Sequence, residues 1–584
     1  MTFRMKHLAF ALALLPAASV MAEGPAAGKG VPAYKPVTDS RLQSPEARNW
    51  LSWRGNYGSW GYSALDKVTD KNVNKLQLAW SYSTGVTEGH QSPPIVNDGF
   101  MFVTTPQNQV LALNAKTGQE IWRYKKEIPS ELFQLHPTNR GVALYGDKVY
   151  VATTDCNLVA LDAKTGKVLW TTQIENWKTG YYMTLAPLAA KGKIMVGVSG
   201  GEYGIRGFIA AVDAETGKMS WRRHTIPGPT EQGGDTWPNN GSYKTGGGSV
   251  WVTGTYDPKT NTAYWGTGNP GPWTPDLRQG DNLFASSTMA LDVDTGEIKG
   301  YHQYAQNDSW DWDEVTPPLL IDTEINGKKT PAAVRAGRNG YMWVLERTNT
   351  GALKFVKGWP YVGNNVFKSL DPKTGRPDVD MTHKPSMKQG AGFCPSLWGG
   401  KDWLPESYSP KTGLIYTMAN DNMCSELPKG ETTTYKAGDL FIGFPLEGVL
   451  TNVRLGPGAK NSIGEIQAWD PKTGKLAWST KFGDQIWTPT FVTGGNLVFS
   501  GGLPDRKFRA MDAKTGKILW EYATPSGVIG VPSSYEVDGE QYIAVQSGWG
   551  VDAQRLASAI DHVRGTNTIV PQGGTLMVFK LPKN

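Results

Sequence analysis

The stretch Leu161-Asp162-Ala163-Lys164-Thr165-Gly166, followed by an indole at Trp170, belongs to a ten-residue pattern that occurs five times in this chain. The copies run from Leu113 to Trp122, Leu161 to Trp170, Val212 to Trp221, Trp469 to Trp478, and Met511 to Trp520. Weaker copies lie at 291–296, 370–375 and 410–413. In each clear copy an apolar run predicts a strand, and the segment from Asp (Asn114 in the first copy) to Gly predicts a tight hairpin turn. The Asp side chain is expected to bond the turn's own backbone, the Gly to take a positive φ, and the Trp to lie on the returning strand.

The spacing of the copies predicts a β-propeller. Successive clear copies lie about 40 to 50 residues apart, which is the length of one four-stranded blade. The 584 residues then make roughly eight blades, and each Trp is expected to pack between neighbouring sheets. An ordinary β-sandwich is the alternative, but sandwiches do not repeat a Trp at this period. We therefore predict an all-β fold, an eight-bladed β-propeller with tryptophan-docking repeats.

Residues 1–22 have the pattern of a secretory signal peptide. Arg4 and Lys6 precede an apolar run at 8–15, and small residues near Ala22 offer a cleavage point. The run is too short to span a membrane, and an uncleaved anchor is the alternative. Removing this segment, with two basic and no acidic residues, lowers the formal net charge from +6 to +4, and no Lys/Arg cluster suggests a nucleic-acid partner. We expect a periplasmic protein with one propeller domain, residues 23–584.

Export implies an oxidising compartment, so the three cysteines bear on the fold. Cys394 and Cys424 flank a hairpin-like stretch and could form a disulfide, which would leave Cys156 over. No Cys-x-x-Cys-His motif occurs, so no covalently held haem is encoded. The seven histidines are scattered and offer no zinc-type cluster.

The segment Asp308-Ser309-Trp310-Asp311-Trp312-Asp313-Glu314 carries four carboxylates in seven residues. Such carboxylates repel one another unless solvent or a cation neutralises them. In an extended strand Asp311 and Asp313 would point to the same side, where they would suit a hard cation that prefers several oxygen ligands. A solvated acidic loop is the alternative.

Three glycine-rich segments are further candidates. Ser199-Gly200-Gly201-Glu202 ends a strand-like run, and its glycines would let a ligand approach the backbone closely. Asn269 lies in a rigid Gly-Asn-Pro-Gly-Pro turn and has an amide oxygen that could bind a metal. Gly246-Gly247-Gly248 precedes Trp251, which could support an aromatic ligand. Each segment has a structural turn or strand entry as its alternative.

These segments, in this order on a propeller, closely resemble the quinoprotein alcohol dehydrogenases, the family of the methanol dehydrogenase large subunit. The resemblance runs from about Trp50 to the C-terminus. It implies an eight-bladed propeller that holds pyrroloquinoline quinone (PQQ) and one metal ion near its axis. It also implies a disulfide between Cys394 and Cys424.

Residue by residue, the resemblance implies a metal site, a quinone site and a base. The implied metal ligands are Glu202, Asn269, Asp311 and Asp313. The implied quinone-binding residues are Gln91, Arg140, Thr184, Ser199, Gly200, Gly201, Trp251, Arg338, Trp487 and Trp549. Asp311 also matches the catalytic base, Trp251 matches a residue stacked on the quinone, and Arg338 matches the cation beside the quinone oxygens.

Some positions distinguish branches within this family. Asp313 resembles an extra acidic residue of the rare-earth-dependent branch, and another carboxylate suits a trivalent ion. A lanthanide is therefore favoured over Ca²⁺, with a solvent-facing Asp313 as the alternative. Gln134-Leu135 replaces a pair of adjacent cysteines that many members place against the quinone. Gln91 stands where Glu is frequent, and Asp402 where Asn is common.

The function expected from the resemblance is PQQ-dependent oxidation of an alcohol to an aldehyde or ketone, with Asp311 as base and the metal as Lewis acid. Without a haem motif, a separate cytochrome c or similar carrier is implied as electron acceptor. The missing cysteine pair suggests a bulky secondary alcohol as substrate. The alternatives are a non-enzymatic periplasmic propeller scaffold of the outer-membrane assembly type, and a quinoprotein relative acting on sugars or large molecules.

Overall fold

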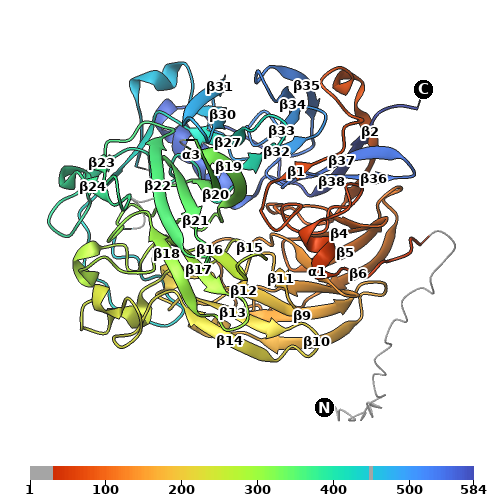
Figure 1. The fold of residues 1–584 in the computed structure, drawn as a ribbon. Coiled ribbons are helices and arrows are strands. Elements are labelled where there is room, and N and C mark those ends of the chain that lie inside the picture. Colours follow the sequence, from red (N-terminus) through yellow and green to blue (C-terminus); the bar gives the residue numbers. More distant parts are fainter. Residues whose placement is uncertain (1–30, 326, 446–451, 584) are drawn as a thin grey trace, which may run out of the picture. The chain divides into compact units, whose positions relative to one another are not determined.

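Eight antiparallel sheets surround a central axis in the computed structural model, which describes residues 31–325, 327–445 and 452–583 (Figure 1). The first four blades are β3 Ile95–Asn97, β4 Phe100–Thr105, β5 Gln109–Asn114 and β6 Glu120–Lys125; β7 Val142–Tyr145, β8 Lys148–Ala152, β9 Asn157–Asp162 and β10 Val168–Gln173; β11 Leu188–Ala190, β12 Lys193–Gly197, β13 Phe208–Asp213 and β14 Met219–His224; β15 Thr255–Asp257, β16 Thr262–Gly266, β17 Ser287–Asp292 and β18 Ile298–Gln303.

The next three blades follow along the chain. They are β19 Leu319–Ile325, β20 Lys328–Ala336, β21 Tyr341–Arg347 and β22 Leu353–Pro360; β26 Ser407–Tyr408, β27 Ile415–Asn420, β30 Gly464–Asp470 and β31 Lys475–Phe482; β32 Phe491–Thr493, β33 Leu497–Ser500, β34 Lys507–Asp512 and β35 Ile518–Ala523, to which the short β1 Tyr62–Ser63 adds in parallel. The prediction of an eight-bladed propeller is confirmed.

The eighth blade closes the ring with strands from both ends of the described chain. β36 Ser533–Val537, β37 Glu540–Ser547 and β38 Thr575–Lys580 come last in sequence, and β2 Gln77–Ser83 pairs with β38 as the outermost strand. Figure 1 shows the red β2 beside the blue β36, β37 and β38. Residues from Pro32 onward form one compact unit.

Smaller elements decorate the blades. They are the hairpin β23 Phe367–Leu370 and β24 Pro377–Val379; the sheet of β25 Ala391–Phe393, β28 Met423–Leu427 and β29 Val453–Leu455; helices α1 Asp39–Gln43 and α3 Gly550–Arg564; and the short 3₁₀ helices η1 Val73–Lys75, η2 Trp177–Thr179, η3 Gly201–Tyr203, η4 Gly234–Thr236, η5 Ser242–Thr245, η6 Pro275–Arg278, η7 Met381–His383 and η8 Pro457–Lys460. The repeat pattern gave no sign of α3, which interrupts the last blade between β37 and β38.

The repeated turns hold adjacent blades together. Asp162 Oδ1 accepts hydrogen bonds from the backbone of Lys164 and Thr165 at 3.1 and 2.8 Å, and Gly166 has a φ of +71°. The indole of Trp122, on the preceding blade, donates to Ala163 O at 3.0 Å. A Cβ added to Gly166 would lie 2.6 Å from Trp122 Cε3, so only glycine fits between turn and indole. The predicted packing of each Trp between neighbouring sheets is confirmed.

Three of the other four indoles make the same contact with a turn of the next blade: Trp170 donates to Ala214 O, Trp221 to Val293 O and Trp478 to Ala513 O. The fourth, Trp520, donates instead to Leu76 O, just before β2 of the eighth blade. Of the weaker copies, only 291–296 is the outer turn of a blade. Residues 370–375 form the accessory β23–β24 turn, and 410–413 join the first two strands of a blade. The turn chemistry is local, whereas its place in a blade depends on which strands flank it.

The alternation of strand direction brings the candidate segments to one end of the propeller. In an antiparallel blade, the entry to the first strand and the link between the second and third strands share one end, opposite the outer turn with its Trp contact. Arg140, Thr184 and Trp251 precede the first strands β7, β11 and β15, while Glu202 and Arg338 lie in links between second and third strands. Residues far apart in sequence therefore face a common opening.

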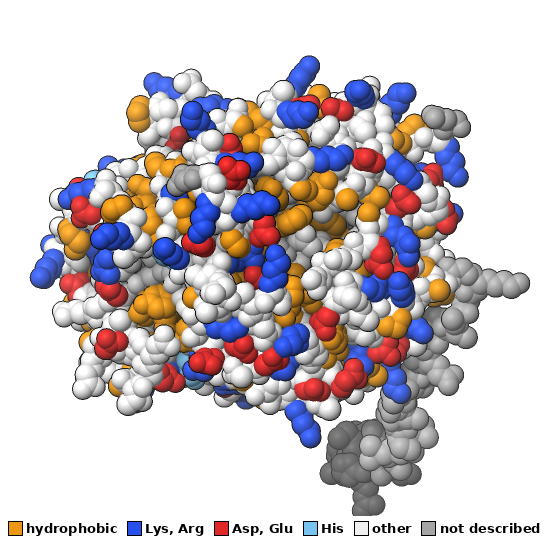
Figure 2. Space-filling view, viewed as in Figure 1, with side chains coloured by type: hydrophobic (Ala, Val, Ile, Leu, Met, Phe, Trp, Pro, Cys, Tyr) orange, Lys and Arg blue, Asp and Glu red, His pale blue; other side chains and the backbone are white. Residues whose placement is uncertain are grey.

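No helix of the described residues is long and apolar enough to cross a membrane. Lys, Arg, Asp and Glu side chains are interspersed on the face shown in Figure 2. The proposed signal peptide, residues 1–22, lies outside the described residues.

Candidate functional site

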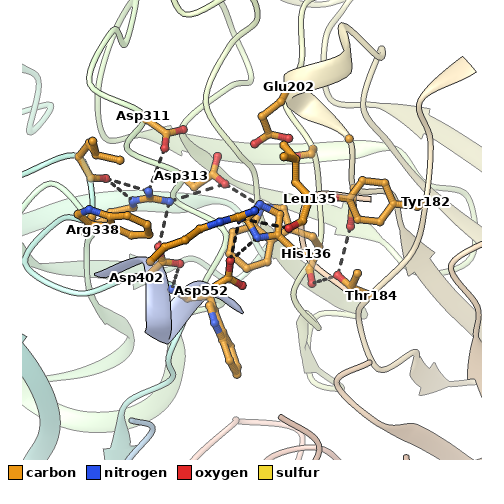
Figure 3. A pocket seen from close by; sticks show the side chains of 18 of the residues that line it. Leu135, His136, Tyr182, Thr184, Glu202, Asp311, Asp313, Arg338, Asp402 and Asp552 are labelled. Carbon is orange, nitrogen blue, oxygen red and sulfur yellow. Dashed lines mark hydrogen bonds and ion pairs between the residues drawn. The ribbon is translucent and has the colours of Figure 1, made fainter. Parts of the chain in front are cut away.

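A cavity of about 310 Å³ lies at the common end of the blades. Six blades contribute to it through the segments that lead into their first strands, with Arg140, Thr184, Trp251, Asp311, Trp403 and Trp487. Cavities of this size are typical of small-molecule sites. Figure 3 shows Arg338 reaching toward Asp311, Asp313 and Asp402, with Glu202 near Leu135 and Asp552 near His136.

A compact turn presents the acidic residues. Asp308 Oδ1 accepts from the backbone N–H groups of Trp310 and Asp311 at 3.2 and 3.1 Å, and Asp311 takes a φ of +63°. The expected extended strand is therefore wrong here. Asp311 and Asp313 still face the same cavity, because the turn directs the indoles of Trp310 and Trp312 away to bond His383 O and Ser396 O.

Arg338 is the cation among these carboxylates. Its guanidinium lies 3.1 Å from Asp311 Oδ2, 3.3 Å from Asp402 Oδ2 and 3.9 Å from Asp313 Oδ2. Glu314 fixes the loop that carries Arg338: it forms a buried ion pair with Arg335 and accepts from the backbone N–H of Arg338 at 3.3 Å. The sequence placed Glu314 among the acidic candidates, but its role in the structure is to hold this loop.

One arginine does not balance the acidic wall. Burial raises the pKa of Asp311 well above its usual range, Arg338 opposes the shift, and Asp313 and Glu202 add to it. Burial likewise raises the pKa of Asp313 to about 7, with Arg338 opposing and Glu202 adding. Carboxylates that are this close and this buried retain their charge only if a further cation joins them.

The donor set has the chemistry of a hard-cation site. Asn269 lies beside Asp313, and its side-chain amide has two orientations. With the amide nitrogen toward Asp313, Asn269 donates to Asp313 Oδ1 at 3.0 Å and its oxygen accepts from the Trp273 indole at 2.9 Å. In the reverse orientation the amide oxygen lies on the side of Asp313. Gly268 leaves room for the carboxylate, since a Cβ there would lie 2.5 Å from Asp313 Oδ1. Glu202 faces the same cavity from η3.

These side chains do not complete a metal site alone. Within the described ranges, no three His, Cys, Asp or Glu side chains gather closely enough to hold an ion. The amide oxygen of Asn269 and oxygens of a bound ligand would have to complete the coordination. Carboxylate and amide oxygens without sulfur or imidazole fit Ca²⁺ or a lanthanide and do not fit zinc.

The other part of the cavity is aromatic and basic. The Arg140 guanidinium lies 4.7 Å from the ring centre of Trp251 and 4.5 Å from that of Trp403. It donates to Thr184 Oγ1 at 2.6 Å, and Thr184 Oγ1 lies 3.2 Å from Ser199 Oγ. The buried Arg140 Nε has no hydrogen-bond partner in the described chain. A planar, anionic ligand fits this pair of indoles and the unpaired donor.

Most of the site residues expected from the sequence line this cavity. They are Arg140, Thr184, Ser199, Gly200, Glu202, Trp251, Asp311, Asp313, Arg338 and Trp487. Four others, Gln91, Gly201, Asn269 and Trp549, are not among the residues that line it. Asn269 contacts Asp313, and a Cβ on Gly201 would lie 3.3 Å from Ser249 Oγ. Gln91 and Trp549 are buried, and Trp549 donates to Gln554 at 3.1 Å.

Several cavity residues were not anticipated. His136 lies next to the expected Leu135, Asp552 and Arg555 come from α3, and Tyr182, Trp273 and Trp398 add aromatic walls. His136 lies two residues after Gln134 in the atypical segment, which is the one signal that could have marked it. Asp552 had no such signal, because nothing in the repeat pattern announces α3.

The disulfide prediction is confirmed: Cys394 and Cys424 are bonded, with Cα atoms 4.4 Å apart, and Cys156 is free and buried. The pair ties β28 to the segment that follows β25. That segment continues to Leu397, whose carbonyl accepts from Arg338 at 2.8 Å.

The chain is similar to known proteins over most of its length. The family model described as "PQQ: Glucose/ethanol/alcohol dehydrogenase, beta-propeller domain" matches residues 50–356 and 479–543. The quinoprotein alcohol dehydrogenase PedH of Pseudomonas putida KT2440 is 36% identical over 548 residues, which cover 89% of each chain. The lanthanide-dependent methanol dehydrogenase of Methylacidiphilum fumariolicum SolV is 37% identical, over 92% of this chain and 93% of that one.

A solved structure extends the similarity to three dimensions. The europium-containing methanol dehydrogenase superposes with a TM-score of 0.86 and 34% identity, over 93% of this chain and all of that chain. Similarity of this extent to dehydrogenases sets aside the non-enzymatic scaffold that the repeats alone left open. The chain belongs to the family of PQQ-dependent quinoprotein alcohol dehydrogenases and is an enzyme of that family.

Proposed function

We propose that this protein oxidises an alcohol to an aldehyde or ketone in the periplasm, using PQQ and a lanthanide(III) ion. The observation that carries the proposal is the division of one cavity into an oxygen-rich wall with Arg338 and an indole-lined part with Arg140. The periplasmic location rests on the signal-peptide pattern of residues 1–22.

The bound groups would be held by different walls. Glu202, Asn269, Asp311 and Asp313 would bind the metal, whose charge would keep the carboxylates ionised. Trp251 would support one face of the quinone and Arg140, Thr184 and Ser199 its acidic groups. The quinone, when bound, supplies an acceptor for the hydride from the alcohol carbon.

The chain's own residues would manage the proton and the charge. Asp311 would accept the hydroxyl proton of the alcohol, with its orientation fixed by the Asp308 turn and by Arg338. Arg338 would stabilise negative charge that develops beside it. The Trp251 indole donates to Asp313 Oδ2 at 2.7 Å, so a hydrogen bond links the indole-lined part of the cavity to its oxygen-rich wall.

The preference for a lanthanide rests on charge. Asp311, Asp313 and Glu202 place three carboxylates at the cavity, and Asp402 adds a fourth near Arg338. A trivalent ion neutralises this wall better than a divalent one and withdraws more electron density from a bound carbonyl.

The proposed substrate rests on the outer walls of the cavity, and the proposed electron acceptor rests on the sequence. Phe133, Leu135, Leu440 and Ile442 give the cavity an apolar side that suits a bulky alcohol. Leu440 and Ile442 come from the segment 425–462, which lacks the repeat pattern. A separate cytochrome c is proposed as the acceptor, because the chain has no haem-attachment motif.

Reconstitution tests the proposal. Purified protein is incubated with PQQ and CaCl₂, or with PQQ and LaCl₃ or CeCl₃, and dye reduction is followed with methanol, a bulky secondary alcohol and glucose. Activity is expected with an alcohol and to be highest with the lanthanides. Asp313→Ala is expected to remove the lanthanide-supported activity selectively, whereas Asp66→Ala, at an exposed residue outside the cavity, should match the unaltered protein. Absence of activity under every condition would overturn the proposal.

A further inference from the structure

A cluster of three basic side chains around one carboxylate lies in the cavity and has no part in the proposed chemistry above except through Arg140. His136 Nδ1 lies 2.7 Å from Asp552 Oδ1, and Arg555 approaches the same oxygen to 3.4 Å. Arg555 also donates to Leu135 O at 3.2 Å. His136, Arg140, Asp552 and Arg555 all line the cavity, and Figure 3 shows His136 and Asp552 close together.

Helix α3 and the atypical segment build this cluster together. Asp552 is in the first turn of α3, and Glu88 holds that end by accepting from the backbone N–H of Val551 at 2.8 Å. His136 follows Gln134-Leu135, the residues that stand in place of the family's cysteine pair. One of the two parts of the cluster, the segment with His136, therefore directly follows a departure from the family's pattern.

The cluster has more positive charge than its own carboxylate can neutralise. The Asp552 side chain is 9% exposed and already bonds His136, while Arg140 Nε has no partner. His136 is 36% exposed, and its Nε2 makes no hydrogen bond to any described residue. Donors of this kind at a cavity wall are suited to an anion, and carboxylates are the anionic groups that PQQ carries.

We propose that His136, positioned by Asp552, is a cationic contact for a carboxylate of the quinone, alongside Arg140 and Arg555, and that quinone affinity therefore depends on pH. This inference rests on the proposed function, since it assumes that the quinone occupies this cavity. Asp552 is a positioning residue: it fixes the ring through Nδ1 and leaves Nε2 to the ligand.

The charged groups that face His136 determine the sign of the effect. They are Asp552 and Arg555 on α3, Glu202 on η3, and Arg140 further along its own segment. Burial lowers the pKa of His136, but Asp552 and Glu202 outweigh burial and Arg555 and hold it above its ordinary value. A bound carboxylate of the quinone raises the pKa of His136 further. PQQ therefore binds most tightly at pH values where His136 of the free protein is protonated. Its affinity declines as pH rises through the pKa of His136 in the free protein.

Equilibrium titration of the metal-loaded protein with PQQ tests the inference. Tryptophan fluorescence reports the Kd between pH 5.5 and 8.5 at fixed LaCl₃, and calorimetry in two buffers of different ionisation enthalpy counts the protons taken up. The Kd of the unaltered protein is expected to rise toward tenfold per pH unit above the His136 pKa, with uptake of up to one proton. The trimethyl ester of PQQ, which lacks the carboxylates, should show neither effect.

Variants separate His136 from the rest of the cavity. His136→Gln should weaken PQQ binding about tenfold at pH 6, change it little at pH 8.5, and flatten the pH profile. Asp552→Asn should move the decline in affinity to lower pH, and Asp552→Glu should restore it. His562→Gln, on the same helix but outside this cavity, is the matched control and should behave like the unaltered protein.

The outcomes distinguish this inference from the proposed function. PQQ binding with no proton uptake, or a His136→Gln profile equal to that of the unaltered protein, would overturn the role of His136 and leave the dehydrogenase assignment standing. Failure of the unaltered protein to bind PQQ at any pH would overturn both. The proton count needs no variant, so an absence of proton uptake overturns the role of His136 even if His136→Gln does not fold.

Discussion

Single side chains give the cavity its chemistry, and Asp311 is the clearest example. Its φ of +63° is unusual for a residue other than glycine, and the Asp308 side chain holds the turn that imposes it. In this conformation the Asp311 side chain faces the cavity, whereas the neighbouring indoles of Trp310 and Trp312 bond His383 O and Ser396 O away from it. A residue held in a rare backbone conformation at a cavity is typical of a functional site.

Replacing the base should stop turnover without emptying the cavity. Asp311→Asn keeps an oxygen and the size of the side chain but removes the proton acceptor. Dye reduction by the reconstituted enzyme is expected to fall about 10²- to 10⁴-fold, while PQQ still quenches tryptophan fluorescence. If the variant retained more than a tenth of the activity, Asp311 would not be the base.

His302, a buried histidine outside the cavity, should contribute to the loss of stability in acid. Burial, with Arg335 adding to the effect, lowers the pKa of His302 to about 3, and its Nε2 has no partner in the described chain. Because the unfolded chain binds the proton more readily, this group costs no stability above about pH 6.5, and stability is lost as pH falls from there toward 3.

His302→Phe should therefore reduce the acid sensitivity of folding. The ring packs beside Tyr304, Trp343 and Phe355, a setting that accepts another planar ring. Between pH 7.5 and pH 4.5 the unaltered protein is expected to lose on the order of 2–3 kcal/mol through this group. Urea denaturation at the two pH values measures it. An equal loss in the variant would show that other groups cause the acid sensitivity.

At the scale of the element, the repeated turn holds two neighbouring blades together through its contact with an indole. In the turn at 162–166, Asp162 bonds the turn's backbone, Gly166 supplies the positive φ, and the Trp122 indole of the preceding blade packs against Gly166. The Gly serves two purposes that can be separated: it accepts the left-handed backbone, and it leaves room for the ring.

Two glycines of the chain separate these purposes. Gly166 and Gly413 have φ values of +71° and +72°, but a Cβ would meet Trp122 at 2.6 Å only at Gly166 and nothing within 4 Å at Gly413. Gly413→Ala should cost about 1–2 kcal/mol, from the backbone alone. Gly166→Ala should cost about 1–3 kcal/mol more, from the clash with the indole. Equal thermal midpoints for the two variants would show that the indole contact adds nothing.

At the scale of the whole molecule, ring closure is what keeps the cavity walls in place. β2 pairs with β38 along its length within the eighth blade, and the Trp520 indole of the seventh blade donates to Leu76 O, just before β2. Because the walls come from segments preceding six first strands, an open ring would lose their relative placement.

Truncation tests the dependence on closure. A chain ending after Gly574 lacks β38, leaves the edges of β2 and β37 unpaired, and is expected to melt at a lower temperature and to be cleaved rapidly by protease. A chain ending after Pro582 keeps the strand and is the control. Equal protease resistance of the two chains would show that the first seven blades hold together without the closing strand.

The sequence by itself determined the elements that depend on neighbours along the chain. The turn from Asp162 to Gly166 is built from its own side chains, so its copies predicted the blades, and the Trp at the end of each copy predicted the packing between them. The ordered segments around Glu202, Asn269, Asp311 and Arg338 pointed to one family because their residue types carry the chemistry.

Only the tertiary structure decided what meets across the ring. The copies at 370–375 and 410–413 have the right turn chemistry but join other strands, because a turn does not encode its position in a sheet. Asp311 faces the cavity through a turn and not a strand, because Asp308 competes for the backbone hydrogen bonds. His136 and Asp552 are 416 residues apart in sequence and pair only because ring closure and α3 bring them to the same end. Contacts of that range are set by topology, which no local pattern contains.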